Sequence, residues 1–522
     1  MAPGAELPLL PLRNQAVFPR TRASVIVMRP PSRELLKSLE PGAELLLFAQ
    51  RDERTEAYPT AADLPEIGVL TRVVSKCEHV PGNDGVEVEV LSRVRLDAVT
   101  QTTPWLRGRS TVIEPAPVTD EASFELHEAL KPRALAVLPT LSAEVKAGLA
   151  AGRDPGQTAD WIASGLPGRV APRAELFATL DGATRLRKVE PLLAAEEARQ
   201  KGILATLERL KRTPRDLWPM EAGAEEHATQ MVAAGTMTTE EAALIRQFAA
   251  NGFVIWPGLI PARDIDALVA DLGRIHEHPG RFLSTDHKRS AGFRFTGPER
   301  DRFESLFDTY VNFESARRVC LHPTIVRFLN LLFGTRPIAT QQLLFQRSNG
   351  HEAHQDTAFV CAEEPLHMVA TWIALEDVVQ GRGELTYFEG SHRIPGHPFA
   401  DGSKRFTGGV DDPAAMRDDL LAQCKAHGCA KRDFLAKKGD VFVWAADLVH
   451  ASNPRTRPIE ETRLSCVTHY CPETTRPLWH TLNPDHQTLQ PYGEHALIGS
   501  SHYRLPFGPD LIRPDFMSPL PT

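Results

Sequence analysis

The sequence predicts a multidomain protein with a β-rich domain, a helical region, a linker and a second domain. Three observations predict this organisation. The chain has 522 residues, more than the roughly 100–200 residues of one domain. Its hydrophobic (42%) and charged (24%) fractions are those of ordinary globular proteins. The spacing of apolar residues changes along the chain, and it divides the sequence into residues 1–118, 119–201, 202–238 and 239–522.

Residues 1–118 contain short apolar runs rich in β-branched residues, separated by turn signals, which predicts a β-rich domain. The turn Pro-Gly-Asn-Asp-Gly at 81–85 predicts a hairpin, because these residues tolerate positive φ. Residues 119–201 then show helical periodicity, as in FELHEALKPRALAVL and TADWIASGL. A helical region therefore follows the β-rich domain.

These two regions resemble the amino-terminal substrate-binding domain of Lon proteases. The resemblance lies in LPLLPLRNQAVFP, the turn RPPS, FAQRDE, DLPEIGVLTRVV and the helical DWIASGL. It implies a PUA-like β barrel followed by a helical bundle that engages protein partners. The sequence contains no G-x-x-x-x-G-K-[ST] phosphate loop, so we do not expect ATP-driven Lon proteolysis.

Residues 202–238 are charged and alanine-rich, and we expect a helical or flexible linker there. Thr238 or Thr239, followed by Glu240 and Glu241, predicts a helix start, because a threonine oxygen caps free amides and acids favour the positive helix end. A second domain is therefore expected at 239–522.

The second domain contains a candidate metal site. In His354-Gln355-Asp356, side chains two residues apart on a strand project from one face, so His354 and Asp356 can bind one ion. His450, at the end of the apolar segment VFVWAADLVH, supplies a third ligand. Two histidines and one carboxylate are the facial triad of non-haem Fe(II) oxygenases, which leaves coordination positions open for a cosubstrate and dioxygen.

A 2-oxoglutarate cosubstrate needs a cation for its far carboxylate, and arginine matches a carboxylate with two parallel hydrogen bonds. Arg463 opens the predicted strand RLSCVTHY, whereas Arg455 and Arg457 lie in the loop PRTRP. A side chain in a proline-bounded loop is less well aimed at an interior site. We therefore predict that Arg463 binds the cosubstrate.

The segment from about 240 to 480 resembles the phytanoyl-CoA dioxygenase family of Fe(II)/2-oxoglutarate oxygenases. The resemblance runs through LIRQFAANGFVIWPGLI, LLFQRSNGHEAHQD, GELTYFEGSHR, KKGDVFVWAADLVHASN and TRLSCVTHYCP, in family order. It implies a double-stranded β-helix, or cupin-like jelly roll, with flanking helices. It also implies that iron is bound by His354, Asp356 and His450, and that the cosubstrate is bound by Arg463, Ser452 and Trp372.

The resemblance implies an enzyme that hydroxylates a C–H bond of a small-molecule substrate, with Fe(II) as the metal and 2-oxoglutarate and dioxygen as cosubstrates. Asp356 favours hydroxylation, because halogenating relatives replace this carboxylate by a small residue. Two alternatives remain: an oxygenase acting on a protein recruited by the Lon-like domain, and a non-catalytic interaction scaffold. The long insert at 395–434 is predicted to be a substrate lid, and the neighbouring histidines, His351, His367, His392 and His397, are predicted to be structural.

Charge and composition exclude other classes of function. Lys and Arg number 59 against 67 Asp and Glu, a net charge of −8, so we expect no nucleic-acid partner. The start of the sequence lacks a signal pattern and no apolar run reaches membrane length, which predicts a cytoplasmic protein. Seven cysteines favour reduced thiols, although a zinc site remains an alternative for the two C-x4-C pairs, Cys424 with Cys429 and Cys466 with Cys471.

Overall fold

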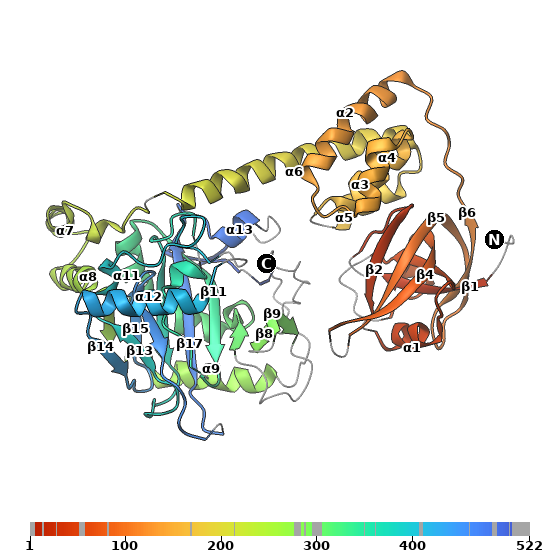
Figure 1. Ribbon diagram of the computed structural model, residues 1–522. Helices are drawn as coiled ribbons and strands as arrows, with labels where there is room; N and C mark the ends of the chain where they lie inside the picture. The colour runs from red at the N-terminus through yellow and green to blue at the C-terminus, as the bar shows by residue number, and fades with distance from the viewer. Residues whose placement is uncertain are drawn as a thin grey trace. The chain divides into compact units, whose positions relative to one another are not determined.

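A computed structural model of the chain describes most residues between Glu6 and Tyr503. The described residues are 6–12, 15–27, 29–51, 58–80, 83–167, 170–212, 214–275, 283–286, 289–294, 305–348, 350–360, 362–406, 411–458, 460–482, 488–500 and 502–503. The chain divides into two compact units, Met1–Gly202 and Ile203–Thr522 (Figure 1). This confirms the expected two-part organisation, while the finer boundaries at 118 and 238 stay predictions.

The first unit begins with a six-stranded sheet in the order β2-β5-β4-β3-β1-β6. Strand β6 pairs with both β1 and β5, so the ladder closes on itself. Strands β4 and β5 form the predicted hairpin, of which Pro81 and Gly82 lie outside the described residues. The elements of this region are β1 (Glu6–Leu12), β2 (Thr21–Val27), α1 (Pro30–Ser38), β3 (Glu44–Ala49), η1 (Ala61–Asp63), β4 (Ile67–Val80), β5 (Asn83–Gln101) and β6 (Arg107–Val112).

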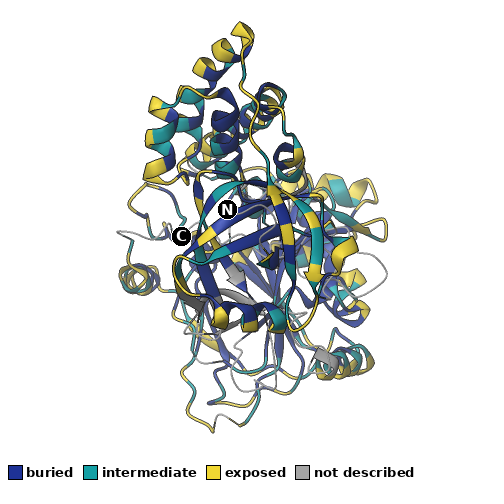
Figure 2. Cartoon of the chain, turned by 90° about the vertical axis from the view of Figure 1, so that its right-hand side faces the viewer, coloured by how far each residue is buried: buried dark blue, intermediate teal, exposed yellow. Residues whose placement is uncertain are grey.

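Five helices follow this sheet. Side chains cap at least four of them, since Asp120, Ser142, Asp154 and Asp181 accept hydrogen bonds from backbone amides of the first turn. The helices share one hydrophobic core with the sheet, in which Leu130 and Ile162 pack in the same cluster as Val88. Buried parts of the chain are dark blue in Figure 2. The helices are α2 (Glu121–Val137), α3 (Ala143–Ala151), α4 (Pro155–Gly165), α5 (Val170–Ala178) and α6 (Gly182–Leu210).

A buried ion cluster also connects sheet and helices in this unit. Arg93 of β5 donates two hydrogen bonds of 2.7 Å to the carboxylate of Asp160 on α4. Arg185 of α6 lies 2.9 Å from the same carboxylate. All three side chains are less than a tenth exposed. Because removing one member would leave a buried charge without its partner, this cluster fixes the helices to the sheet.

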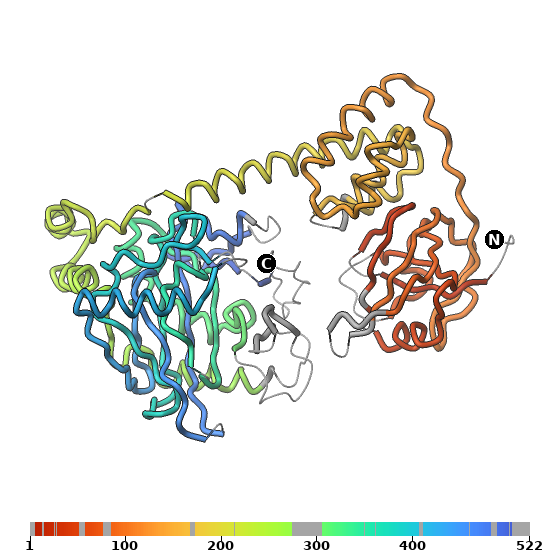
Figure 3. Tube along the Cα trace, in the orientation of Figure 1, coloured from red at the N-terminus to blue at the C-terminus, as the bar shows by residue number. Residues whose placement is uncertain are grey.

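The expected linker is more structured than its composition suggests. Helix α6, seen as the long yellow helix in Figure 3, continues to Leu210, and η2 (Trp218–Met220) and α7 (Ala224–Ala233) follow. Leu217 is only 3% exposed and belongs to the main core of the second unit. The Trp218 indole donates a hydrogen bond of 2.9 Å to the Leu331 carbonyl. A few buried apolar residues are enough to anchor this largely exposed segment to the core, and an average over composition does not reveal them.

The second unit is built on a large sheet and a three-stranded sheet. The large sheet has the order β7-β15-β12-β17-β11-β10-β8-β9, extended by β19 and β18, and the small sheet has the order β14-β13-β16. The strands are β7 (Phe253–Trp256), β8 (Leu283–Asp286), β9 (Arg289–Arg294), β10 (Ser305–Phe307), β11 (Pro337–Phe345), β12 (Val369–Ala374), β13 (Leu385–Phe388), β14 (Lys431–Phe434), β15 (Val441–Ala445), β16 (His450–Ser452), β17 (Ser465–Pro472), β18 (Gln490–Tyr492) and β19 (Ala496–Ile498).

Central strands of the large sheet are buried on both faces. In β15, Val441 and Val443 belong to the core that includes helix residues. Phe442 and Trp444, which alternate with them, belong to a second core that also contains residues of the small sheet. This explains why β15 reads as a continuous apolar run. The second core is where the candidate site lies.

Helices complete the second unit. Helix α8 begins as expected. The Thr238 hydroxyl accepts a hydrogen bond from the Glu241 amide, and the Glu241 carboxylate accepts one from the Thr238 amide. No helix among the described residues has the length and apolar content needed to cross a membrane. The remaining helical elements are α8 (Thr239–Asn251), α9 (Ala262–Ile275), η3 (Thr309–Val311), α10 (Glu314–Cys320), α11 (Pro323–Phe333), η4 (Asp356–Ala358), η5 (Ser391–Arg393), α12 (Pro413–Ala426) and α13 (Leu478–Leu482).

Candidate metal centre

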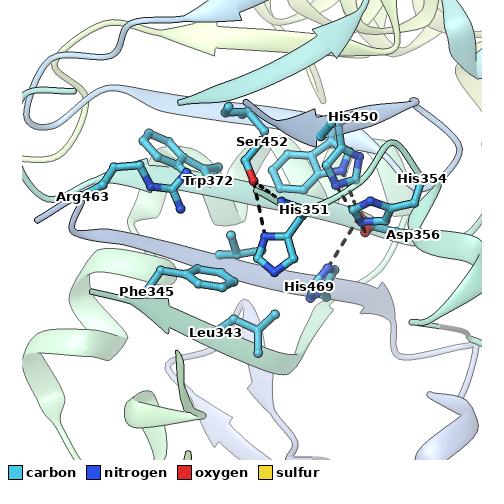
Figure 4. A pocket seen from close by; sticks show the side chains of 14 residues that line it. Leu343, Phe345, His351, His354, Asp356, Trp372, His450, Ser452, Arg463 and His469 are labelled. Carbon is cyan, nitrogen blue, oxygen red and sulfur yellow. Dashed lines mark hydrogen bonds and ion pairs between the residues drawn. The ribbon is translucent and has the colours of Figure 1, made fainter. Parts of the chain in front are cut away.

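A pocket lies between the two sheets of the second unit (Figure 4). Side chains from six strands of the two sheets line it together with the loop that carries His354. All six residues predicted for the site are among the lining residues, which are Leu343, Phe345, His351, His354, Asp356, Trp372, Leu385, Trp444, His450, Ala451, Ser452, Arg463, Val467 and His469.

Short elements bring the three predicted metal ligands together. The backbones of His354 and His450 form an isolated antiparallel bridge, with hydrogen bonds of 3.0 and 3.1 Å. Asp356 is the first residue of the 3-10 turn η4 rather than part of a regular strand. The side chains of these three residues nevertheless converge, so that one ligand atom from each lies within 4.8 Å of the other two.

Both histidine rings are oriented by hydrogen bonds on the side away from the site. The His354 Nδ1 lies 2.7 Å from the Glu352 carbonyl, and the His450 Nδ1 lies 3.0 Å from the Leu448 carbonyl. A carbonyl only accepts, so each Nδ1 carries the proton and donates it. Each Nε2 therefore presents its lone pair to the centre, as is usual for metal-binding histidines.

The carboxylate of Asp356 is oriented by two other pocket residues. Its Oδ2 accepts a hydrogen bond of 2.9 Å from the Trp444 indole and lies 3.6 Å from the His469 Nε2. Its Oδ1 faces the two histidine ligands, at 3.7 Å from the His354 Nε2 and 3.6 Å from the His450 Nε2. One oxygen is thus held by the protein and the other is directed to the centre.

The spacing of these three atoms suits one metal ion. Nitrogen and oxygen ligands lie about 2.0–2.2 Å from a divalent transition metal, so two of them on one ion are at most roughly 4.2 Å apart. The distances of 3.6 and 3.7 Å from the Asp356 Oδ1 to the two Nε2 atoms meet this limit. Among the described residues, no other group of three histidine, cysteine or acidic side chains meets it.

The protonation states also suit a metal ion. Burial, followed by the neighbouring His450, lowers the pKa of His354 to about 4. Burial alone would raise the pKa of Asp356, but His450, His469 and His354 favour the carboxylate, and the pKa of Asp356 lies well below its usual value. At neutral pH the centre therefore offers a carboxylate and a neutral His354, the forms that bind metals.

Arg463 lies toward the other end of the pocket from His354 (Figure 4). Its side chain is 3% exposed, and its backbone amide bonds to Gln346 of the neighbouring chain segment. Its guanidinium packs over Phe345 and Trp372 and donates one hydrogen bond of 2.8 Å, to the Gly383 carbonyl. Within the described part of the chain its Nε has no acceptor. Burial, followed by the charge of Arg455, lowers the pKa of Arg463 to about 10, so it remains a cation at neutral pH.

The competing arginines are engaged elsewhere. Arg455 donates to the Pro458 and Glu461 carbonyls, and Arg457 donates to the Glu461 carboxylate at 2.9 Å. Neither lines the pocket. Of the three arginines considered from the sequence, Arg463 alone presents its guanidinium to the pocket, in agreement with the preference given to it.

Ser452 and Trp372 lie between the two ends of the pocket (Figure 4). The Ser452 hydroxyl accepts a hydrogen bond of 2.6 Å from the His351 amide and one of 3.0 Å from the Ser348 hydroxyl. Trp372, on β12, places its ring 5.6 Å from the Arg463 guanidinium. Both predicted residues thus line the pocket, and Trp372 forms part of the apolar wall around the cation.

Eight of the pocket residues were not predicted for the site, and three of these carry ring N–H groups, namely His469, Trp444 and His351. His469 continues the alternation of β17 that already places Arg463 and Val467 in the pocket, and that signal could have identified it. His351, expected to be structural, lines the pocket beside Ser452. Trp444 gave no such signal, because its bond to Asp356 joins residues 88 positions apart.

Three other features noted in the sequence, His392, the two cysteine pairs and the insert at 395–434, contribute no residue to the lining of the pocket. The ring of His392 packs against the end of α8 and contacts the Ala249 carbonyl at 3.0 Å, as expected for a residue that closes a turn. Cys424 lies in a core around α12, whereas Cys466 and Cys471 lie in two further clusters, so the described structure does not bring the C-x4-C pairs into one zinc site. The insert at 395–434 contains α12 and β14, and its residues 407–410 lie outside the described part.

Two family models match the chain. Residues 6–195 match the ATP-dependent protease La (LON) substrate-binding domain, and residues 248–458 match phytanoyl-CoA dioxygenase (PhyH). The chain joins a Lon substrate-binding domain to a phytanoyl-CoA dioxygenase domain. Both resemblances read from the sequence are thereby confirmed. The second match includes the three candidate ligands but ends before Arg463.

Curated relatives match the Lon domain. The Lon protease of Chloroflexus aurantiacus is 32% identical over 187 residues, which are 35% of this chain and 22% of that protein. Lon protease 4 of Sorangium cellulosum is 33% identical over 198 residues, which are 38% of this chain and 24% of that protein. The chain therefore spans about a quarter of the length of these relatives.

Solved structures resemble each domain. The non-haem α-ketoglutarate-dependent epimerase SnoN from nogalamycin biosynthesis is 19% identical over 49% of this chain and 98% of its own, with a TM-score of 0.35. EctD from S. alaskensis, solved with bound iron, is 18% identical over 46% of this chain and 79% of its own, with a TM-score of 0.35. The N-terminal domain of Lon protease from the Mycobacterium avium complex is 21% identical over 36% of this chain and 98% of its own, with a TM-score of 0.30.

Proposed function

We propose that the phytanoyl-CoA dioxygenase domain is an Fe(II)- and 2-oxoglutarate-dependent hydroxylase of a small molecule. One observation supports this most directly. A single pocket holds a His-Asp-His centre and, toward its other end, the buried Arg463, whose Nε has no acceptor among the described residues. A keto acid with a second, remote carboxylate fits both parts at once. The overall reaction converts 2-oxoglutarate, dioxygen and a C–H bond into succinate, carbon dioxide and a C–OH group.

The metal would be held by the Nε2 atoms of His354 and His450 and by the Oδ1 of Asp356. These donors are the two-histidine, one-carboxylate set of non-haem Fe(II) oxygenases. Bound Fe(II) would supply open coordination positions and the redox chemistry that consumes dioxygen. The protein orients the three donors through the Glu352 and Leu448 carbonyls and the Trp444 indole.

Arg463 would bind the far carboxylate of 2-oxoglutarate. Among the described residues, the buried guanidinium has one carbonyl acceptor and no carboxylate at ion-pair distance, although Glu384 and Glu376 lie near enough to favour its charge. An entering carboxylate would supply a direct partner through charge-assisted hydrogen bonds. Leu343, Phe345 and Trp372 surround this part of the pocket with apolar surface. Exclusion of water there strengthens the ion pair, because the local dielectric constant falls.

We also propose a fold for each unit, namely a PUA-like β barrel with a helical bundle for the first and a double-stranded β-helix for the second. The closed strand pairing of the first unit is the arrangement expected of a PUA-like β barrel, and the helices after it that of a helical bundle. In the second unit, two sheets enclose a shared core and a pocket, as expected of a double-stranded β-helix. A site between two rigid sheets holds its side chains in fixed positions.

The substrate is proposed to be a small molecule rather than a CoA thioester. Phosphates would need free cations, but three cations in or just after the insert, Arg432, Lys437 and Lys438, have acidic partners of their own. Lys437 contacts Asp377 at 3.2 Å, and Arg432 contacts Glu389 at 3.3 Å. Lys438 likewise contacts Asp266. Such pairs are typical of a solvated surface.

The Lon domain supports an alternative in which the substrate is a protein. A domain that matches a substrate-binding module has the potential to engage a protein, and it would bring that protein to the oxygenase. The test is affinity capture with residues 1–202, followed by mass spectrometry of the captured proteins for added oxygen when the full chain, Fe(II) and 2-oxoglutarate are supplied. Capture without any oxidised residue would contradict the alternative.

The main proposal is tested by succinate formation. The purified chain, with Fe(II) and 2-oxoglutarate under air, should form succinate slowly and faster when a metabolite library contains the substrate. The Arg463→Lys variant serves as the control for site-specific turnover. Failure of the wild-type chain to form any succinate above the metal-only background would overturn the proposal.

A further inference from the structure

Beside the metal centre lies an exposed aromatic ring that the mechanism above does not use. Phe359 immediately follows η4, the turn that begins at the ligand Asp356, and is 46% exposed. Its backbone amide donates to the Asp356 carbonyl at 2.9 Å. The backbone that carries the ring is therefore hydrogen-bonded to the metal ligand Asp356, although almost half of the side chain faces solvent.

Phe359 contacts the outer side of the centre. Its ring centroid lies 5.6 Å from that of His354, in an edge-to-face arrangement. The His354 side chain is 20% exposed, compared with 6% for Asp356 and 9% for His450. His354 is thus the most exposed of the three ligands, and Phe359 lies directly beside it.

A second ring extends this surface. Phe406, half-buried, lies 5.8 Å from Phe359 between ring centroids and 5.9 Å from Phe399, which is 5% exposed. The Phe406 amide donates to the Ala358 carbonyl at 2.9 Å, which ties the insert to η4. Two aromatic side chains from separate segments therefore form one apolar surface supported by a buried core.

The acidic residue of this loop, Glu352, is already paired. Glu352, two residues before His354, accepts a hydrogen bond of 2.6 Å from Arg417 of α12, and Arg417 also contacts Asp418. A single exposed phenylalanine needs no explanation in a soluble protein. An exposed phenylalanine on a hydrogen-bonded turn, in contact with a metal ligand and with a second aromatic ring, is suited to an apolar ligand.

We propose that Phe359 and Phe406 form the substrate-contacting surface of the oxygenase and select a small molecule with a flat apolar or aromatic ring. This rests on the proposed function for the identity of the reaction, and it adds the class of substrate. The ring of the substrate would stack on Phe359, which places its C–H bonds beside His354. Phe359 is thus a specificity-determining residue.

The test measures binding rather than turnover. Saturation-transfer NMR on the full chain would compare 2-naphthol, a flat apolar probe, with glycine betaine, a compact polar one. We expect 2-naphthol to bind and glycine betaine not to bind. Phe359→Ala should weaken 2-naphthol binding by about tenfold, because it removes the stacking partner, while Phe359→Tyr should keep it. Phe124→Ala, at a comparably exposed phenylalanine (40%) of the Lon domain, is the matched control and should bind like wild type.

Wild-type affinity of the Phe359→Ala variant for 2-naphthol, or binding of glycine betaine that is equally sensitive to this substitution, would overturn the inference. Phe359 is exposed, so the variants should fold, and circular dichroism checks this. Because binding is read without 2-oxoglutarate, the outcome is independent of catalysis. Absence of succinate formation together with Phe359-dependent binding would count against the proposed function and not against this surface.

Discussion

The orientation of His354 and His450 shows how single residues prepare the centre. Each ring donates from Nδ1 to the carbonyl two residues earlier in its own segment, at 2.7 and 3.0 Å. Such local bonds fix both the tautomer and the ring plane before any ion arrives. The centre is thus preorganised by backbone geometry, and the loss of a ligand should affect metal binding far more than folding.

The first prediction follows from this preorganisation. His354→Ala or Asp356→Ala should lower Fe(II) affinity by more than roughly 100-fold and abolish turnover, since loss of an outer-shell partner alone typically costs 10–100-fold. Anaerobic Fe(II) titration measures the affinity, and circular dichroism should show an unchanged fold. His397→Ala is the matched control, because that side chain is also 20% exposed and pairs with Asp419 outside the centre. Normal Fe(II) affinity in either ligand variant would contradict the assignment of these three residues as metal ligands.

Arg463 carries the second prediction. Arg463→Lys keeps the charge but loses the planar pair of donors, so the 2-oxoglutarate concentration for half-maximal rate should rise about 10- to 100-fold, the equivalent of one charge-assisted hydrogen bond. Fe(II) affinity should change little. Arg457→Lys, on a side chain bound to Glu461 outside the pocket, serves as the control. An unchanged 2-oxoglutarate requirement would contradict this role of Arg463 and would make Arg455 the next residue to substitute.

Among the single residues of the site, those in recognisable motifs could be predicted from the sequence. His354, Asp356, His450, Arg463, Ser452 and Trp372 all line the pocket. The bond from Trp444 to Asp356 could not be predicted, because it depends on how η4 packs against β15. Phe359 was not singled out either, since a phenylalanine in a sequence carries no sign of whether it will be buried or exposed.

Among the secondary-structure elements, η5 connects the small sheet to α8 through a histidine that should make stability depend on pH. The His392 Nε2 lies 3.0 Å from the Ala249 carbonyl, and among the described residues its Nδ1 has no partner. Burial lowers the pKa of His392 to about 4. A second proton would lie on a buried nitrogen without an acceptor, so the folded state resists protonation.

The third prediction is the consequence for stability. Between about pH 6.5 and pH 4 the unfolded chain binds a proton at His392 that the folded chain does not, so stability falls as the pH falls through this window. His392→Gln keeps a donor for the Ala249 carbonyl but cannot titrate. Its free energy of unfolding, measured by urea denaturation, should depend on pH less steeply than that of wild type, by about 1 kcal/mol per pH unit. Identical pH dependence in the two proteins would contradict it.

Elements were predicted best where local signals and tertiary packing agree. The start of α8 follows from Thr238 and Glu241, and a capping box acts within one turn. The segment at 202–238, predicted to be a helical or flexible linker, contains the helix α7, and its Leu217, Ala228 and Met237 lie in the core of the second unit, which its composition did not indicate. Low average hydrophobicity does not show whether the few apolar residues present are buried together.

At the scale of the whole molecule, the chain joins a domain that matches a substrate-binding module to one that contains the candidate centre. Each unit has its own core, and all the lining residues of the pocket belong to the second unit. The chemistry we propose therefore requires nothing from residues before Ile203. The two-part architecture was readable from the sequence, because motif order is preserved within each half.

The last prediction is that residues 203–522 fold alone, bind Fe(II) and decarboxylate 2-oxoglutarate, whereas residues 1–202 are folded and inert. The starting residue matters. A fragment that begins at Met220 omits Leu217, Trp218 with its bond to the Leu331 carbonyl, and Leu210, which packs against Leu478. Loss of these buried side chains should destabilise the shorter fragment by several kcal/mol, about 2–5 for each large core residue removed. Thermal unfolding and Fe(II)-dependent succinate formation compare the two fragments with the full chain. If residues 203–522 are folded and bind Fe(II) but remain inactive where the full chain is active, the Lon domain must contribute to the active site.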